Sequence, residues 1–275
     1  MSVWSFEGKR AVIVGCATGM GHAAAAELVR LGAELHGFDI KPTDVKLASF
    51  NTIDLKDPAS IDRAVAGIEG DIDLLFNCSG LPQTFPAIDV LKVNFIGMRH
   101  WTQQWLPRIR RGGAVASISS TAGFAYMQRL PTILEFISTP DFDSAVAWAE
   151  QNPETIADGY GFSKEAISCW TMMMGAQTIR NGVRINCICP GPTTTPMMPD
   201  FEAVASASLI DVFTKPIERR SSPEEQAYPL IFLNSDAATF VNGHMLNVDG
   251  GFVGAVTTGQ IDLEAELAKV VPPSG

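Results

Sequence analysis

Short apolar runs alternate with longer stretches in which apolar residues recur at helical spacing, along almost the whole chain. The apolar runs predict strands at residues 11–14, 34–38, 72–76, 114–118, 183–188 and 244–248. The stretches between them predict helices over residues 21–31, 58–68, 87–110, 161–181 and 223–234. Strands that alternate with helices pair in parallel through crossover connections, so the pattern predicts an α/β fold. We expect one domain in which helices cover both faces of a doubly wound parallel sheet.

One long segment interrupts this alternation. Residues 124–159 lie between a predicted strand and the helix expected after it, and they are too long for an ordinary loop. We therefore predict a helical insertion. One of its helices should cover residues 141–151, with Thr139 and Pro140 as N-cap and first turn.

The composition indicates a folded chain with an acidic surface. Of the 275 residues, 46% are hydrophobic and 18% are charged, which excludes a disordered chain. The 30 acidic and 20 basic residues give a formal net charge of −10. Such a chain repels phosphate backbones and anionic lipid, so we expect neither nucleic acid nor a membrane as a partner.

The cysteine and histidine residues favour neither disulfides nor metal binding. The five cysteines form no CxxC pair and the four histidines are scattered, so no cluster has metal-ligand spacing. The N-terminus lacks the layout of a signal peptide, and no apolar run reaches the roughly 20 residues that cross a bilayer. We therefore expect a cytoplasmic protein without a bound metal.

A glycine-rich loop follows the first predicted strand and opens the first predicted helix. Its candidate cofactor-binding residues are Gly15, Thr18, Gly19, Met20 and Gly21. Glycine lets the backbone turn tightly and lets a pyrophosphate approach bare N–H groups, where the helix dipole adds positive charge. Glycine clusters also occur in plain turns, but the position between a strand and a helix favours a dinucleotide site.

The second predicted strand is followed by Asp39, 24 residues after Gly15. A carboxylate there can accept hydrogen bonds from the hydroxyls of the adenosine ribose, and it repels a 2′-phosphate. Neither Thr18 nor Ile40 supplies the cation that a 2′-phosphate requires. We expect NAD rather than NADP as the cofactor, with a solvated turn aspartate as the alternative.

A tyrosine and a lysine stand four positions apart, at Tyr160 and Lys164. On a helix such residues share one face, so the ammonium can lie beneath the phenol. A cation there stabilises phenolate and lowers the tyrosine pKa from about 10 toward the working pH, as general acid–base catalysis requires. A tyrosine and a lysine on the protein surface can have the same spacing. Tyr160 and Lys164 therefore indicate catalysis only together with the other motifs of the chain.

These motifs occur in one fixed order. They are the glycine loop, Asn77-Cys78-Ser79-Gly80, Asn94, Ile118-Ser119-Ser120, Tyr160-x-x-x-Lys164 and the segment beginning Pro190-Gly191-Pro192-Thr193. Together they resemble the short-chain dehydrogenase/reductase family in its single-domain form, from Lys9 to Gly251. The resemblance implies a Rossmann-like sheet and an enzyme that transfers a hydride between a nicotinamide cofactor and an alcohol or ketone.

The resemblance also implies a role for each matching residue. Tyr160 would be the acid–base group, Lys164 its pKa modifier and a ligand of the cofactor ribose, and Ser120 the holder of the substrate oxygen. Asn94 would hold a water that links Lys164 to solvent. The remaining cofactor contacts would come from Asp54, Leu55, Asn77, Gly80, Pro190, Gly191, Thr193 and Thr195.

The spacing of the catalytic residues departs from the family pattern. Ser120 and Tyr160 are 40 residues apart, much farther than is usual in the family, so the insertion must return Tyr160 to its place. A long insertion here, together with Arg219 and Arg220, looks like bacterial 3α-hydroxysteroid dehydrogenase/carbonyl reductase and coniferyl-alcohol dehydrogenase.

Substrate choice should depend on residues 196–220, where the family usually carries a lid, while a tail over residues 252–275 ends the chain. The candidate substrate residues are Phe124, Met197, Met198, Phe201 and Phe213. An apolar wall of this kind suits a bulky lipophilic secondary alcohol, such as a hydroxysteroid or a cyclic terpenoid alcohol. The same side chains can equally be core or subunit contacts.

Other functions are compatible with parts of this pattern. A phenylpropanoid alcohol dehydrogenase shares all the motifs, whereas a 3-oxoacyl-carrier reductase should prefer NADP and show a basic docking patch. A noncatalytic NAD-sensing protein needs no serine, tyrosine and lysine set. A Rossmann-like methyltransferase needs neither that set nor the Pro190-Gly191 loop.

The predicted helix over residues 161–181 carries apolar side chains on more than one face, including Trp170 and Met173. We therefore expect a homo-oligomer, a dimer or tetramer, whose assembly the insertion shapes.

Overall fold

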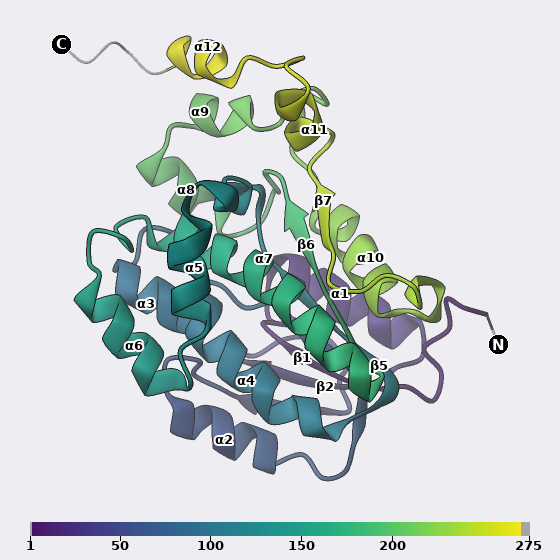
Figure 1. The fold of residues 1–275 in the computed structure, drawn as a ribbon. Coiled ribbons are helices and arrows are strands. Elements are labelled where there is room, and N and C mark those ends of the chain that lie inside the picture. The colour runs from purple at the N-terminus through teal and green to yellow at the C-terminus, as the bar shows by residue number, and fades with distance from the viewer. Residues whose placement is uncertain (1, 271–275) are drawn as a thin grey trace.

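Seven parallel strands form one sheet through the centre of the computed structural model, which describes residues 2–270 (Figure 1). The strands are β1 (Arg10–Val14), β2 (Glu34–Asp39), β3 (Ser49–Thr52), β4 (Ile72–Asn77), β5 (Ile109–Ile118), β6 (Arg184–Pro190) and β7 (Met245–Val248). Their order is β3-β2-β1-β4-β5-β6-β7, and Val14 of β1 lies opposite both Phe38 and Asn77. The order reverses between β1 and β4, so the connections at their carboxyl ends diverge and leave a crevice.

Helices cover both faces of the sheet, which confirms the doubly wound prediction. One face carries α1 (Gly19–Arg30) and α10 (Pro223–Asn234), which pack against each other. The other carries α2 (Pro58–Ala66), α3 (Ala87–Leu91), α4 (Met98–Trp105) and α7 (Gly159–Thr178). Alternate strand residues enter separate apolar cores, with Val12 on the α4 side and Ile13 on the α1 side, because successive side chains point to opposite faces.

Two predicted elements differ from the structure. The edge strand β3 was not predicted, because its four residues are partly or fully exposed and form no apolar run. The single helix predicted over residues 87–110 is instead α3, a π-helical turn at Lys92–Gly97, α4 and a 3₁₀ turn at Leu106–Arg108. Within the π-helical turn, a Cβ on Gly97 would lie 2.1 Å from the Leu55 carbonyl oxygen, so the backbones meet there.

The insertion over residues 124–159 contains helices of its own, as predicted. They are α5 (Leu130–Ile137) and α6 (Phe142–Gln151), and they pack on each other and on the layer that holds α3 and α7 (Figure 1). The predicted cap is wrong: the Asp141 carboxylate, not Thr139, accepts the Ser144 N–H at 2.8 Å and starts α6. Thr139 instead accepts a hydrogen bond from buried Arg99.

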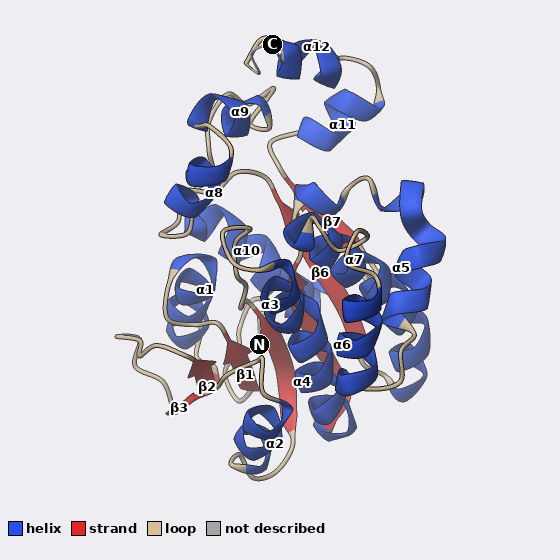
Figure 2. Cartoon of the chain, turned by 90° about the vertical axis from the view of Figure 1, so that its left-hand side faces the viewer, coloured by secondary structure: helices blue, strands red, loops and turns tan. Residues whose placement is uncertain are grey.

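Residues 196–220, called the lid below, form a cap at the carboxyl end of the sheet. The lid contains α8 (Met198–Val204) and α9 (Ala207–Val212), and the tail adds α11 (Phe252–Thr257) and α12 (Leu263–Ala268). Figures 1 and 2 show these short helices gathered at one end of the molecule, with α12 beside α9. Residues 271–275 of the expected tail lie outside the described residues. None of the helices within residues 2–270 has the length and apolar character needed to span a membrane.

Candidate active site

The glycine loop lies at the crevice between β1 and β4. Gly15 has a φ of +88°, and a Cβ there would lie 2.3 Å from the Ser79 backbone nitrogen. A Cβ on Gly21 would lie 1.8 Å from the Gly15 carbonyl oxygen. Only glycine fits these positions, so the loop turns tightly and leaves the start of α1 accessible. Thr18, the N-cap residue of α1, makes no capping bond with its hydroxyl.

Asp39 lies beside this loop at the end of β2. Its carboxylate accepts the Ala17 N–H at 2.9 Å and the Lys41 N–H at 3.1 Å. One contact fixes the glycine loop against β2, and the carboxylate keeps further acceptor capacity for ribose hydroxyls. The predicted adjacency of the loop and the acidic strand end is therefore found.

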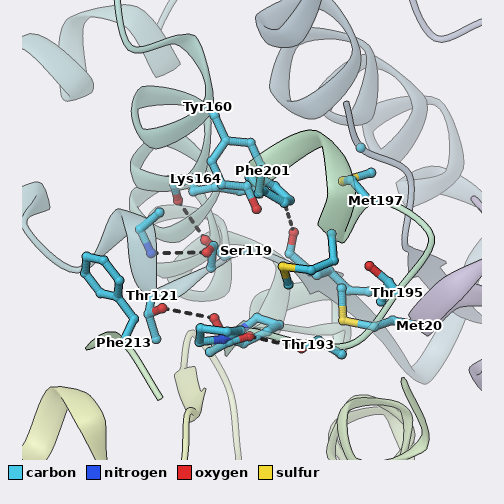
Figure 3. Close-up of a pocket in the computed structure, with 18 of the residues that line it drawn as sticks. Met20, Ser119, Thr121, Tyr160, Lys164, Thr193, Thr195, Met197, Phe201 and Phe213 are labelled. Atoms are coloured by element: carbon cyan, nitrogen blue, oxygen red, sulfur yellow. Dashed lines mark hydrogen bonds between the residues drawn. The ribbon is translucent and has the colours of Figure 1, made fainter. Parts of the chain in front are cut away.

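Ser120, Tyr160 and Lys164 line one cavity where β5 ends against α7. Figure 3 shows Tyr160 and Lys164 there. The Lys164 ammonium lies 5.4 Å from the centre of the Tyr160 ring and donates to the Ile118 carbonyl oxygen at 3.0 Å. Ser119, the other serine of the motif, is buried and donates to the Lys164 carbonyl oxygen at 2.8 Å. Ser120 is partly exposed and lines the cavity.

Desolvation dominates the electrostatics of these groups. It raises the pKa of Tyr160 to about 12, while hydrogen bonding with the Ser120 hydroxyl acts in the opposite direction. Burial lowers the pKa of Lys164 to about 8. The predicted lowering of the Tyr160 pKa by Lys164 is not found in the protein alone, because loss of water and the neighbouring Asp158 charge both raise this pKa and only the Ser120 hydrogen bond lowers it.

Asn94 lies in the π-helical turn and is buried. Its carboxamide oxygen accepts the Leu81 N–H at 2.6 Å, and its nitrogen donates to the Leu81 carbonyl oxygen at 3.1 Å and to the Ser163 hydroxyl at 3.2 Å. These bonds fix the loop after β4 to α7. A Cβ on Gly80 would lie 3.5 Å from the Asn94 oxygen and 4.0 Å from the Lys164 ammonium, so all three are close.

Several predicted cofactor residues do not line the cavity described below: Gly15, Thr18, Gly19, Gly21 and Asp39 of the loop and strand end already described, and also Asp54, Leu55 and Asn77. Asn77 is buried within the sheet, where its nitrogen donates to Thr102 at 2.9 Å and to Ser117 at 3.0 Å. Its side chain therefore joins β4 to α4 and β5, and its predicted place on the adenosine side stays a prediction. Asp54 and Leu55 follow β3, and Leu55 is buried.

One cavity of about 420 Å³ brings most of the predicted site together. The predicted residues that line it are Met20, Gly80, Ser120, Phe124, Tyr160, Lys164, Pro190, Gly191, Thr193, Thr195, Met197, Met198, Phe201 and Phe213. Sequence reasoning missed Gln83, Ala205 and Ile210, because no motif marks them and only the fold turns them inward. We call this space the catalytic cavity.

The lid closes the catalytic cavity over the tyrosine. Phe201 of α8 packs edge-on against Tyr160, with ring centres 5.0 Å apart (Figure 3). Phe213 packs against buried Phe252 of the tail at 5.3 Å. Two of the predicted substrate residues thus cover the cavity, and the tail supports the second of them.

The residues present fit a nicotinamide dinucleotide. A Cβ on Gly19 would lie 3.5 Å from the Thr195 side chain, so the glycine loop and the loop after β6 face each other across a narrow gap. The first loop could hold the pyrophosphate, Asp39 the adenosine ribose, and Lys164 the second ribose.

Comparison with known proteins agrees with this geometry. Residues 9–132 match the family model described as short chain dehydrogenase, and residues 145–253 match the one described as Enoyl-(Acyl carrier protein) reductase. The chain is 32% identical to coniferyl-alcohol dehydrogenase of Pseudomonas sp. (strain HR199 / DSM 7063), over 88% of this chain and 96% of that one. It is also 32% identical to 3-alpha-hydroxysteroid dehydrogenase/carbonyl reductase of Comamonas testosteroni, over 87% and 95% of the two chains.

The crystal structure of the 3-alpha-hydroxysteroid dehydrogenase from Pseudomonas sp. B-0831, complexed with NADH, is similar with a TM-score of 0.78. It shares 28% sequence identity, and the match covers 92% of this chain and 99% of that one. The sheet, the Ser120, Tyr160 and Lys164 cluster and these relatives lead to one conclusion. The chain belongs to the short-chain dehydrogenase/reductase family of nicotinamide-dependent oxidoreductases.

Proposed function

We propose that this protein is an NAD-dependent oxidoreductase that interconverts a bulky hydrophobic secondary alcohol, of the hydroxysteroid or cyclic terpenoid type, and its ketone. One observation carries the proposal. The hydroxyls of Ser120 and Tyr160 lie in a cavity whose wall is otherwise rich in apolar side chains, among them Met197, Phe201 and Ile210. Such a cavity favours an apolar molecule with one oxygen at the reacting carbon.

Ser120 and Tyr160 would hold that oxygen and move its proton. In oxidation the Tyr160 oxygen takes the hydroxyl proton of the alcohol, and in reduction it returns a proton to the carbonyl oxygen. The Ser120 hydroxyl donates a hydrogen bond to the same oxygen as charge develops on it. When bound, the nicotinamide cofactor accepts or supplies the hydride.

Lys164 and Asn94 support this proton transfer. The buried ammonium lies 5.4 Å from the Tyr160 ring centre and stabilises the phenolate once it forms. Asn94 fixes Leu81 and α7 together beside the ammonium, the position from which we propose that it holds a water near Lys164.

The preference for NAD rests on Asp39. Its carboxylate lies at the end of β2 beside the glycine loop, where a 2′-phosphate would meet a negative charge. NAD is the expected partner for that reason, and the comparison of rates with NAD and NADP tests it.

A coniferyl-type alcohol dehydrogenase is the second candidate, because the relative named for that activity is as similar as the steroid dehydrogenase. An acyl-carrier reductase is disfavoured by the net charge of −10, since acidic carrier proteins are recognised by basic surfaces.

We also propose that the protein is cytoplasmic and forms a dimer or tetramer. The insertion covers part of the α3 and α7 layer, so it alters the surface left for assembly. Leu134 on α5 is 41% exposed, and Leu134→Glu should reduce the mass in solution if α5 lies in an interface.

The function is tested by following reduction of NAD and of NADP with a panel of 3α-hydroxysteroids, cyclic terpenoid alcohols and cinnamyl alcohols. We expect turnover of one class with NAD, and a fall of about 10³-fold in kcat/KM for Tyr160→Phe. Activity that survives in this variant contradicts the assignment of Tyr160. NAD binding without turnover of any alcohol favours the noncatalytic, NAD-sensing alternative.

A further inference from the structure

The loop after β4 adds one polar side chain to the catalytic cavity that the proposed reaction does not use. Gln83 lines the cavity and is partly buried, and within residues 2–270 its carboxamide makes no hydrogen bond. Gln83 is neither in the glycine loop nor in the serine, tyrosine and lysine set. A carboxamide can donate two hydrogen bonds and accept two, so it can bind a polar group that enters the cavity.

The other polar side chains of the cavity are already engaged or face the cofactor side. Ser119 and Thr121 donate to backbone carbonyl oxygens, and Thr193 bonds to Gly191 and Ser221. Ser79 and Thr195 also make no side-chain hydrogen bond within the described residues, but they lie against Gly15 and Gly19 of the glycine loop.

The residues on either side of Gln83 contact other segments. Leu81 is bonded by the Asn94 carboxamide through both its N–H and its carbonyl oxygen. The Thr84 hydroxyl donates to the Asp200 carboxylate of α8 at 3.5 Å. Gln83 therefore lies where the loop after β4 meets the lid, in a turn in which the Phe85 N–H donates to the Pro82 carbonyl oxygen at 3.4 Å.

We infer that Gln83 binds a second oxygen of the substrate, separate from the one held by Ser120 and Tyr160. The surrounding wall is apolar, so a substrate that fits is a lipophilic alcohol with one further hydrogen-bonding group, such as a ketone, a hydroxyl or a phenol, away from the reacting carbon. An analogue without that group leaves the Gln83 carboxamide without a partner in a largely apolar wall, and it is bound less well. The inference rests on the proposed function and defines its substrate class.

Matched substrate pairs test the inference. One pair is a 3α-hydroxysteroid with a ketone at the far end of its rings and the same steroid without that ketone. The other is 4-hydroxycinnamyl alcohol and cinnamyl alcohol. Each is assayed with the wild type, with Gln83→Leu and with the control Gln151→Leu, which changes an exposed glutamine at the end of α6.

We expect Gln83→Leu to lower kcat/KM about tenfold for the two-oxygen member of the pair that turns over, and less than about twofold for its partner. The control should change neither value, and NADH affinity should be the same in all three proteins. Equal losses for both members of a pair, or no loss for either, overturn the inference.

A separate measurement distinguishes this failure from failure of the proposed function. If the wild type turns over none of these compounds, their binding to the NADH-loaded protein is measured by calorimetry, which tests the subsite without the reaction. Tighter binding of the two-oxygen member that is lost in Gln83→Leu supports the polar subsite although the reaction is wrong. Binding without such a preference, or no binding, overturns the subsite.

Discussion

The two segments inserted after the central strands β5 and β6 are held in place by different kinds of contact. In the insertion over residues 124–159, Phe136 has no exposed surface and packs against Phe95 and Phe162, with ring centres 5.2 and 5.3 Å apart. In the lid, the Lys215 ammonium pairs with Glu266 of α12 at 2.6 Å, and these side chains are 34% and 20% exposed.

A second pair of contacts repeats the difference. Arg99 is buried and donates to the backbone between α5 and α6, including the carbonyl oxygens of Thr139 and Asp141 at 2.9 and 2.8 Å. Arg220 joins the two lid helices through Glu202 at 2.6 Å and Asp211 at 2.8 Å, all with partly exposed side chains.

The difference in burial predicts that the two segments differ in how easily they move away from the sheet. Contacts removed from water contribute strongly to stability, whereas exposed ion pairs contribute little and weaken with salt. The insertion should therefore unfold only with the sheet, while the lid can open at a small cost in free energy. Since Phe201 of the lid covers Tyr160, that opening would admit the substrate.

The largest effect is expected for Phe136→Ala. The change leaves a cavity in the aromatic cluster, so the free energy of unfolding should fall by about 4 kcal/mol in urea denaturation. Phe213→Ala in the lid is the matched control, and it should cost about 1–2 kcal/mol because Phe213 is partly exposed. Equal losses for the two variants would contradict the difference between the segments.

Arg99→Leu should reduce the free energy of unfolding by about 3 kcal/mol. The substitution keeps an apolar stem but leaves the carbonyl oxygens between α5 and α6 buried without their donor. Thermal and urea unfolding measure the loss, and Arg220→Leu in the lid should lose less than half as much. A loss below about 1 kcal/mol for Arg99→Leu would show that other donors bind the carbonyl oxygens between α5 and α6 in the variant.

Lys215→Met should change the free energy of unfolding by less than about 1 kcal/mol, since an ion pair whose side chains both still reach solvent is worth little. The same variant should raise KM for a bulky alcohol severalfold, because the lid loses one of its contacts with the tail and keeps only the packing of Phe213 on Phe252. Adding salt to about 1 M should also raise the KM of the wild type, and it should leave the KM of the variant almost unchanged. A KM that neither the substitution nor salt moves would mean that the lid does not depend on the tail.

Most of the fold could be predicted from the sequence, because buried parallel strands and amphipathic helices leave strong periodic patterns. The strand β3 left none, since it lies at the sheet edge and is half exposed. The π-helical turn at Lys92–Gly97 also left none, since its cause is the close contact between Gly97 and Leu55, far apart in sequence.

The candidate site divides in the same way. Motif residues such as Tyr160 and Asp39 were predictable, because each is tied to a local turn or a helix face. The bonds of Asn77 within the sheet were not predictable, since the motif marks the residue but not the direction of its carboxamide. Gln83 could not be found, because no motif marks it and only the fold brings the loop after β4 to the catalytic cavity.

The sequence by itself determined the parallel sheet, the glycine loop and the identity of the serine, tyrosine and lysine set, since these depend on spacing within short segments. Only the tertiary structure decided how far these side chains are removed from water, which groups lie beside them and which segments cover them. Desolvation raises the pKa of Tyr160 to about 12 and lowers that of Lys164 to about 8, and both shifts come from residues brought together by folding. The lid that closes over Tyr160 and the tail that supports it are likewise products of long-range packing, which no local pattern encodes.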